Sequence, residues 1–350
     1  MTILIALAAL ALCFYLLAVL TERFFVPAID ILAKKLKLSS DASGATLLAM
    51  GSSAPEFFTS LIAVVGLAGS GHADIGAGTI VGSAIFNVLV IVGASATFKA
   101  VKLQWKPVMR DQLFYVITIL MLLWTFGDGK ITMPEALGFV AMYGVYVYFV
   151  VNWRKWLKYP EPPAPKAVKE EKHSVLQAIT HRVIGFVVPD VAKHPKLYVV
   201  SFGMSLVAIA ALSWLLVDQA IVLADALHIN PTFVALTILA AGTSIPDLIG
   251  SIVVAKQGRG DMAVSNAVGS NIFDILFGLG LPWMIALIIH PGAITVSTEN
   301  LAASIFLLFA TVVATLFLLI ARNWRLGRRS GLVLISLYVI YCIYTILQVS

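Results

Sequence analysis

The stretch GSSAPEFFTS, residues 51–60, places a carboxylate and a proline together inside a long apolar segment. The carboxylate belongs to Glu56, and Pro55 comes directly before it. A second stretch, GTSIPDLIGS at residues 242–251, repeats the arrangement with a proline directly before Asp247. Proline interrupts a helix and a carboxylate opposes burial, so both copies carry two features that an apolar helix ordinarily excludes.

Composition identifies the surroundings in which this pattern has to be explained. Of the 350 residues, 60% are hydrophobic and only 12% are charged, and the mean hydropathy is +0.96. A soluble domain has about 25% charged residues, so the chain is predicted to be an integral membrane protein in contact with a lipid bilayer. The net charge of +6 requires no nucleic acid, because an excess of Lys and Arg in a membrane protein usually sets its orientation. Cys13 and Cys342 lie in apolar segments and are predicted to be packing residues, and the oligomeric state stays open.

Ten apolar segments are candidates for membrane-spanning helices, which need about 20 residues each. The sequence therefore predicts an all-α integral membrane protein with ten transmembrane helices. The first segment lacks the basic start and the small-residue cleavage site of a signal peptide, so we expect it to remain as a helix. The ten segments are 3–21, 42–66, 75–98, 112–127, 133–152, 197–217, 226–255, 262–289, 300–321 and 330–348.

Lysine and arginine residues indicate how these helices are oriented. All 24 of them except Lys130 are assigned to loops on one side of the predicted membrane, among them Arg110 after the third segment. The positive-inside rule places that side in the cytoplasm, so both termini are expected outside it. The short central loop and the lack of a cleavable signal favour a prokaryotic inner membrane.

A central loop at 153–196 divides the chain. Its part at 159–174 is rich in proline and charge and is typical of a linker. The residues that follow, 175–188, fit either a short amphipathic surface helix or a plain loop. The predicted organisation is a first repeat of five helices at 1–152, a cytoplasmic linker, and a second repeat of five helices at 197–350. An odd number of spans in each half means that the two halves enter the membrane in opposite directions.

Matching motifs occur in the two halves, at about 44–98 and about 234–284. In the first motif, Gly51, Ser52, Ser53, Pro55 and Glu56 face Gly242, Thr243, Ser244, Pro246 and Asp247 at a constant offset of 191 residues. In the second, Gly82, Ser83 and Asn87 face Gly269, Ser270 and Asp274 at an offset of 187 residues. An inverted repeat with glycine- and proline-interrupted segments points to a transport site near the middle of the membrane.

The chemistry of these positions favours a cation. A carboxylate at the bilayer centre costs about 2.5–3.5 kcal/mol on insertion scales, so it is retained only with a cation, a proton or a buried partner. Hydroxyls three and four residues before Glu56 and Asp247 share their helical faces, and the prolines free backbone carbonyls. The nearby side chains offer oxygen and neither His nor Cys, which fits Ca²⁺ or Na⁺ and argues against Zn²⁺ or Cu⁺.

The second helix of each motif adds more oxygen ligands at helical spacing. Ser83 and Asn87 are four residues apart, as are Ser270 and Asp274, so each pair lies on one face. Glu56, Asp247 and Asp274 together can balance three monovalent cations, or one divalent cation with one monovalent ion or proton. Such a site can exchange one set of bound cations for the other without leaving uncompensated carboxylate charge in the membrane.

At GSSAPE, GTSIPD, VGSAIFN and VGSNIFD the chain resembles the sodium/calcium exchangers of the cation/Ca²⁺ antiporter superfamily, over about 50 residues of each half. The resemblance implies a transporter without enzymatic activity or resident cofactor, which exchanges Na⁺ for Ca²⁺ by alternating access. It implies that the first and sixth helices are long and slide against the core. The ligands that it implies are Glu56, Asp247, Asp274, Asn87, Ser52, Ser53, Thr243, Ser244, Ser83 and Ser270, with the backbone carbonyls of Ala49 and Ala240.

Several alternatives remain open at this point. The acids Asp247 and Asp274 resemble those of the K⁺-dependent branch, although K⁺-independent prokaryotic relatives are similar at Asp274. The proton-coupled branch usually has a Gly-Asn-x-x-Glu motif, which neither repeat contains. Transport of another divalent ion such as Mg²⁺ or Mn²⁺ and, more remotely, a cation channel also fit some of the pattern. An intramembrane aspartyl protease has no use for the hydroxyl-rich repeat, and hydroxyls in membrane helices also bond back to their own backbone.

Overall fold

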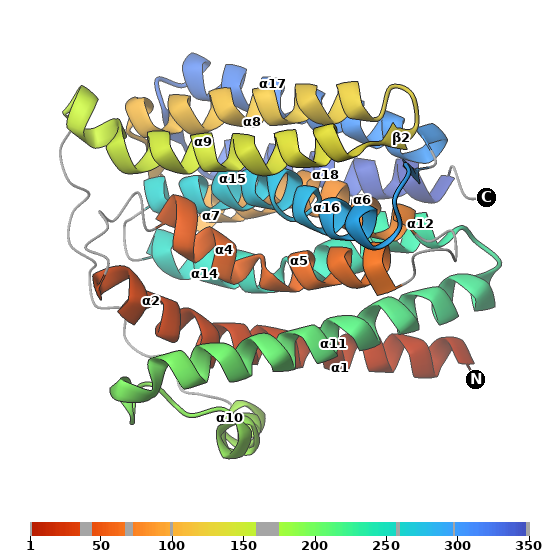
Figure 1. The fold of residues 1–350 in the computed structure, drawn as a ribbon. Helices are drawn as coiled ribbons and strands as arrows, with labels where there is room; N and C mark the ends of the chain where they lie inside the picture. Colours follow the sequence, from red (N-terminus) through yellow and green to blue (C-terminus); the bar gives the residue numbers. More distant parts are fainter. Residues whose placement is uncertain are drawn as a thin grey trace.

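The computed structural model describes residues 2–35, 44–66, 73–98, 101–158, 175–256, 260–296 and 298–347. The described chain is a bundle of helices joined by short turns (Figure 1), so the predicted all-α class is confirmed. The linker residues 159–174 and the ends of two expected segments, 42–43 and 348, lie outside the described residues.

The first half contains the following elements. They are α1 (Thr2–Leu20), η1 (Thr21–Phe25), α2 (Val26–Lys35), η2 (Gly44–Leu48), α4 (Ala49–Ser52), α5 (Ala54–Leu61), η3 (Ile62–Gly66), α6 (Ala73–Phe86), η4 (Asn87–Ile91), α7 (Val92–Phe98), β1 (Val101–Lys102), α8 (Trp105–Thr125), β2 (Lys130–Ile131) and α9 (Met133–Leu157).

The second half follows the same plan. Its elements are α10 (Val175–Val187), η5 (Pro195–Leu197), α11 (Tyr198–Leu227), α12 (Pro231–Val234), η6 (Ala235–Leu239), α13 (Ala240–Thr243), α14 (Ile245–Lys256), α15 (Gly260–Leu276), α16 (Gly280–Ile289), β3 (Ile294–Thr295), α17 (Thr298–Ala321), β4 (Arg325–Leu326) and α18 (Arg328–Leu347).

Helices lie at all ten expected segments, with different lengths at several of them. Eight helical runs of the described chain are long and apolar enough to cross a membrane, and a ninth is added if the bent pair in 45–65 counts as one span. The helix α18 at the tenth expected segment is not among them. The first helix runs on through η1 and α2 to Lys35, and α11 extends to Leu227, well beyond the expected end at 217.

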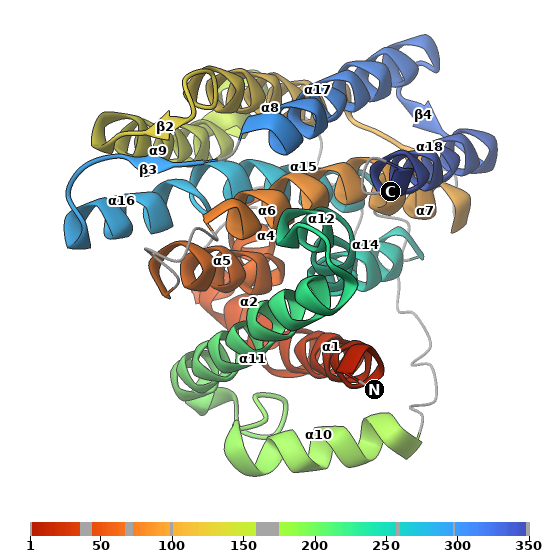
Figure 2. The same ribbon diagram turned by 90° about the vertical axis from the view of Figure 1, so that its right-hand side faces the viewer.

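Three layers of helices build the bundle. The pair formed by α1–α2 and α11 lies on one face, and α8, α9 and α17 lie on the opposite face (Figures 1 and 2). The helices of the two repeated motifs, α4 to α7 and α13 to α16, lie between them. A cluster that includes Leu10, Leu17 and Leu216 fills the contact of the long pair, and a larger apolar cluster lies in the rest of the bundle. Cys13 and Cys342 are unpaired and pack in these clusters, as expected.

The segment α10 is a helix, which resolves the open choice between helix and loop. It lies outside the bundle below α1 and α11 (Figure 2). Tyr15 Oη donates to Thr180 Oγ1 at 3.2 Å, and the ring of His181 stacks on Phe24 at 5.1 Å between centroids. These contacts attach α10 to the first helix.

Two short antiparallel strand pairs connect the halves. β1 pairs with β4, and β2 pairs with β3. β1 lies before the fourth helix of the first half, and its partner β4 lies before the fifth helix of the second half. β2 lies before the fifth helix of the first half, and its partner β3 lies before the fourth helix of the second half. This exchange is the pattern expected when the two halves are related by an inverted repeat.

Arg110 corrects one expectation from the sequence. It was assigned to a loop after the third segment, but α8 begins at Trp105 and contains it. Its side chain is only 1% exposed, and its Nε donates to Asp111 Oδ1 at 2.8 Å. Tyr146 and Ser265 also donate to the Asp111 carboxylate. A buried ion pair with added hydrogen bonds allows a charged residue inside the bundle, which counting charges along the sequence does not foresee.

Candidate cation site

The first helix of each motif breaks at the same point. Helix α4 gives way to α5 at Ser53, and α13 gives way to α14 at Ser244, in each case two residues before a proline. The backbone angles φ and ψ are −86° and 9° at Ser53 and −83° and 2° at Ser244. In the first motif the two parts are bent by 57°. Because proline supplies no N–H to the preceding turn, the repeated sequence produces the repeated break.

Wide helical turns lie beside these breaks. The π-helical turns η2 and η6 precede them at positions that differ by 191 residues, the same offset as the motifs. Another π turn, η4, begins at Asn87. The matching helix of the second half ends at Leu276, just after Asp274, and restarts at Gly280. Such turns are rare and occur frequently at functional sites.

Glycines allow the two hairpins to cross. A Cβ at Gly82 on α6 would collide with the carbonyl oxygen of Leu236 in η6. A Cβ at Gly269 on α15 would lie 3.1 Å from the carbonyl oxygen of Ala45 in η2. The second helix of each hairpin therefore passes directly over the first helix of the other. This crossing brings the carboxylates of the two halves together.

The three predicted carboxylates lie in this crossing. Glu56, Asp247 and Asp274 are each 0% exposed, and they interact electrostatically with one another. Ser244 Oγ donates to Glu56 Oε1 at 3.0 Å and lies 2.7 Å from Ser83 Oγ. The structure thus joins residues from both motifs of both halves.

Hydroxyls from each half lie against carboxylates of the other. Ser52 lies against Asp247, and Thr243 lies against Glu56. Within the second half, Ser270 Oγ donates to Asp247 Oδ1 at 3.3 Å. Thr243 Oγ1 also donates to the carbonyl of its own helix at Leu239, at 2.9 Å. A hydroxyl that donates in this way keeps lone pairs that can face a cation.

The carbonyls of Ala49 and Ala240 are not released by the prolines. Ala49 O accepts from Ser53 N at 3.0 Å and Ser52 Oγ at 3.4 Å. Ala240 O accepts in the same way from Ser244 N and Thr243 Oγ1, each at 3.4 Å. In a helix, the N–H of each residue bonds to the carbonyl four residues before it. Pro55 and Pro246 have no N–H, so the carbonyls that lose this bond are those of Gly51 and Gly242.

Buried oxygens without a protein partner define what the site can bind. Burying an acceptor without a hydrogen bond costs about 1–3 kcal/mol, and more when it is charged. A cation shared among these oxygens would satisfy them together, and Ca²⁺ takes six to eight oxygen ligands. Within the described residues, no three His, Cys, Asp or Glu side chains form a metal cluster by themselves, so hydroxyl and amide oxygens have to complete the coordination. Among the described residues, the buried oxygens without a close hydrogen-bond partner are Glu56 Oε2, Asp247 Oδ2, both carboxylate oxygens of Asp274, Asn87 Oδ1 and Ser53 Oγ, with Ser53 lying against Asp274.

Comparison with known proteins identifies the family. Residues 6–152 and 197–347 match the family described as sodium/calcium exchanger protein. The chain belongs to the sodium/calcium exchanger family. It is a Na⁺/Ca²⁺ exchange antiporter of the membrane, and not an enzyme.

Relatives and solved structures agree with this assignment. The exchanger is 27% identical to sodium/potassium/calcium exchanger 2 of Mus musculus, over 95% of this chain and 76% of the relative. It is 25% identical to sodium/potassium/calcium exchanger 1 of Gallus gallus, over 95% of this chain and 77% of the relative. It has the fold of the sodium-calcium exchanger NCX_Mj soaked with Na⁺ and Sr²⁺, with a TM-score of 0.61, 22% identity and 97% of each chain covered.

Two polar residues of the exchanger site escaped the sequence analysis. Asn266 Nδ2 donates to Asp247 Oδ1 at 3.3 Å, and Asn271 contacts Asn87. Asn266 could have been found, because it continues the spacing of four residues through Ser270 to Asp274. Asn271 departs from the repeat, since an alanine occupies the matching position in the first half.

Proposed function

We propose that the exchanger moves Na⁺ and Ca²⁺ alternately through one site at the crossing of the two hairpins. The unpartnered buried oxygens carry this proposal, because they come from both halves and need a cation. The ligands are the side-chain oxygens of Glu56, Asp247, Asp274, Asn87, Ser52, Ser53, Thr243, Ser244, Ser83 and Ser270, with the carbonyls of Ala49 and Ala240 as weaker candidates.

Charge balance explains how one site serves both ions. Three carboxylates match three Na⁺ ions, or one Ca²⁺ with one monovalent ion or proton. Either load offsets the buried charge, whereas the empty site leaves it uncompensated in a medium of low dielectric. The site therefore changes the side of the membrane to which it opens most easily when it holds Na⁺ or Ca²⁺. Entry of Na⁺ then drives extrusion of Ca²⁺.

Alternating access is assigned to the long pair α1–α2 and α11. A cavity of about 320 Å³ lies between part of this pair and the motif helices. Phe25, Ile29 and Phe202 line it from the long helices, and Phe57 and Phe273 line it from the core. An apolar contact of this kind has few polar bonds to break, which suits sliding of one layer on another.

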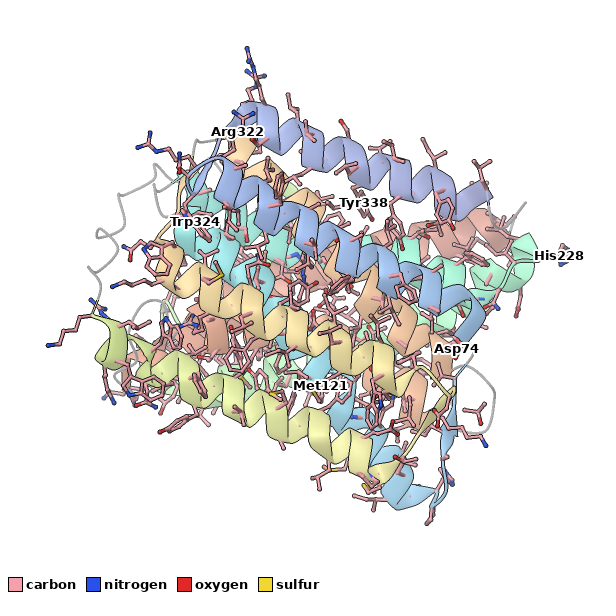
Figure 3. All side chains as sticks on the ribbon, turned by 90° about the horizontal axis from the view of Figure 1, so that it is seen from above. Asp74, Met121, His228, Arg322, Trp324 and Tyr338 are labelled. Carbon is pink, nitrogen blue, oxygen red and sulfur yellow. The ribbon has the colours of Figure 1, made fainter. Side chains whose placement is uncertain are left out.

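The orientation follows from the basic residues. We assign both termini to the outside, the loop 153–196 to the cytoplasm, and the protein to a prokaryotic inner membrane. Arg322 and Trp324 lie at one end of the bundle, and Asp74 and His228 lie at the other (Figure 3), which supports this separation of the two sides. The same division gives a first repeat at 1–152 and a second at 197–350.

Co-transport of K⁺ is the second candidate. Relatives that match 95% of this chain are named sodium/potassium/calcium exchangers, and among the described residues neither oxygen of Asp274 has a close hydrogen-bond partner. A K⁺ ion on Asp274 would supply the monovalent charge that accompanies Ca²⁺.

Uptake of ⁴⁵Ca²⁺ into proteoliposomes loaded with Na⁺ tests the proposed coupling. Outside Na⁺ is replaced first by choline and then by K⁺. We expect uptake that requires internal Na⁺, and a further requirement for external K⁺ would establish the second candidate. Uptake that is indifferent to internal Na⁺ would contradict exchange through this site and leave a channel or another coupling ion.

A further inference from the structure

Two buried amides meet at the crossing of the hairpins. Asn87 Nδ2 donates to Asn271 Oδ1 at 2.8 Å, and both side chains are 0% exposed. Asn87 starts η4 in the first half, and Asn271 lies on α15 in the second. The bond therefore links a proposed ligand to a residue that contributes no ligand of its own.

The polarity of this bond is fixed by a backbone carbonyl. Asn271 Nδ2 donates to Ala84 O at 3.0 Å and to Tyr115 Oη at 2.8 Å. A carbonyl oxygen only accepts, so the amide nitrogen of Asn271 has to face Ala84. Its oxygen then faces Asn87, which has to present its own nitrogen in return. Asn87 Oδ1 is left pointing away from Asn271, and it has no hydrogen-bond partner among the residues that the structure describes.

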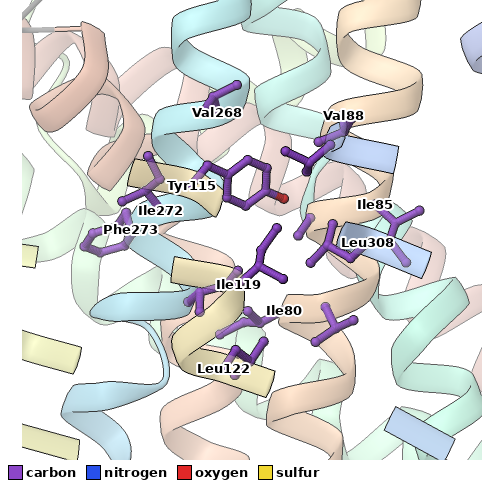
Figure 4. Close-up of a cluster of buried hydrophobic side chains, with 14 of the residues drawn as sticks. Ile80, Ile85, Val88, Tyr115, Ile119, Leu122, Val268, Ile272, Phe273 and Leu308 are labelled. Atoms are coloured by element: carbon purple, nitrogen blue, oxygen red, sulfur yellow. The ribbon is translucent and has the colours of Figure 1, made fainter. Parts of the chain in front are cut away.

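Tyr115 on α8 holds this arrangement from the layer formed by α8, α9 and α17. Its ring is buried in the large apolar cluster, with Val88, Val268 and Ile119 around it (Figure 4). Close packing leaves the ring little freedom to turn. The Tyr115 hydroxyl is consequently a fixed acceptor for the second N–H of Asn271.

We propose that Asn271 is a positioning residue that turns the oxygen of Asn87 toward the transported cation. The inference rests on the proposed function of the site. If the amide of Asn87 were reversed, its N–H groups would face the cation and repel it. Hydrogen-bond partners that orient a metal ligand in this way typically raise metal affinity 10- to 100-fold.

The repeat supports this role. Asp274, the counterpart of Asn87, is a carboxylate whose two oxygens are equivalent, so it needs no partner to choose between them. Asn87 is an amide with one oxygen, and it is the one that meets Asn271. The counterpart of Asn271 is Ala84, which has no such group to offer. The half that has an amide ligand at Asn87, where its counterpart is Asp274, is therefore the half whose ligand is met by Asn271, where the counterpart is Ala84.

The substitution Asn271→Ala tests the proposal in proteoliposomes. We expect the KM for Ca²⁺ to rise about 10-fold with kcat largely kept, because only ligand orientation is lost. Ca²⁺ should also raise the Tm of the purified variant less than that of the wild type. The matched control is Thr118→Val on α8, which removes a buried hydroxyl bonded to Phe114 O at 2.8 Å and should leave the KM unchanged.

A double-mutant cycle separates positioning from general structural damage. In an Asn87→Ala background, Asn271→Ala should add no further rise in KM, because the amide to be oriented is gone. An additive rise, or an unchanged KM in Asn271→Ala alone, would overturn the proposal. If Asn271→Ala does not fold, Asn271→Leu fills the space without an amide. A folded Asn271→Leu variant with a wild-type KM would also overturn the proposal.

The two levels of inference fail in different ways. A wild-type protein without Na⁺-dependent uptake would contradict the proposed function. An active wild type with an unaffected Asn271→Ala variant would contradict only the role of Asn271.

Discussion

Glu56 and Asp247 are each held by the protein through one of their two carboxylate oxygens. Ser244 donates to one oxygen of Glu56, while Ser270 and Asn266 donate to one oxygen of Asp247. In the described part of the chain, the other oxygen of each carboxylate has no hydrogen-bond partner. The protein bonds fix the geometry of the group, and the remaining oxygen is available to the ion.

Asp274 differs, because among the described residues no close hydrogen bond of the kind that fixes Glu56 and Asp247 reaches either of its oxygens, and Ser53 is the hydroxyl that lies against it. We predict that Asp274→Asn retains exchange with an approximately 10-fold higher KM for Ca²⁺, since the amide keeps one oxygen but loses the charge. Asp247→Asn should abolish uptake. If the wild type requires K⁺, Asp274→Asn should remove that requirement. Uptake assays with and without external K⁺ measure both effects, and a wild-type KM in Asp274→Asn would contradict the assignment of this residue.

The sequence predicts the site residues better than their bonding. The spacing of prolines, hydroxyls and acids is local, so it is visible in the amino-acid sequence. The structure brings the predicted side chains together. The hydrogen bonds of Asn271 and Tyr115 depend on which helices cross, which spacing along the chain does not contain. The buried pair of Arg110 and Asp111 is hidden for the same reason, because the partners of Asp111 lie on other helices.

At the scale of elements, the crossing of α6 over η6 determines the site. Gly82 and Gly269 permit the close approach, and the repeated offset shows that both crossings come from the same motif. The broken helices were predictable from proline and glycine. The continuation of the first helix through η1 is hidden in the local sequence, because Glu22 and Arg23 indicate a polar end to the segment, and only the resemblance implied a long first helix.

Substitution at the crossing should destabilise the protein. In Gly82→Ala, the new Cβ would collide with Leu236 O and lie 2.7 Å from the Cβ of Ala240. Overpacking of this kind costs about 1–3 kcal/mol, so we expect a lower Tm in detergent and weaker Ca²⁺ uptake. The matched control is Gly144→Ala on α9, where no atom lies within 4 Å of the new Cβ. Alanine there should leave the Tm unchanged or raise it, and equal effects of the two substitutions would contradict the crossing.

At the scale of the whole molecule, the exchanger consists of a motif core between two helical layers. The layer formed by α8, α9 and α17 is joined to the core by a large apolar cluster and by the Asp111 and Tyr115 contacts. The long pair α1–α2 and α11 meets the core through a smaller apolar cluster, with the apolar cavity along part of the contact. The layer of α8, α9 and α17 is therefore suited to hold the site, and the long pair is suited to move over it.

Filling the cavity should slow transport without weakening the binding of Ca²⁺. Leu206 on α11 lines the cavity, whereas its neighbour Val207 is 72% exposed. We predict that Leu206→Trp lowers kcat several-fold because the larger ring obstructs sliding, while the Ca²⁺-induced rise in Tm stays as in the wild type. Val207→Trp should change neither quantity. A wild-type kcat in Leu206→Trp would argue against movement at this contact.

The most direct test of the proposed site compares Glu56→Gln with Asp218→Asn in the same ⁴⁵Ca²⁺ uptake assay with Na⁺-loaded proteoliposomes. Asp218 is an exposed acid on α11 away from the crossing, so its substitution controls for the loss of one negative charge. We predict wild-type uptake for Asp218→Asn and no detectable uptake for a folded Glu56→Gln protein. Full uptake by Glu56→Gln would contradict the claim that this carboxylate binds the transported cation.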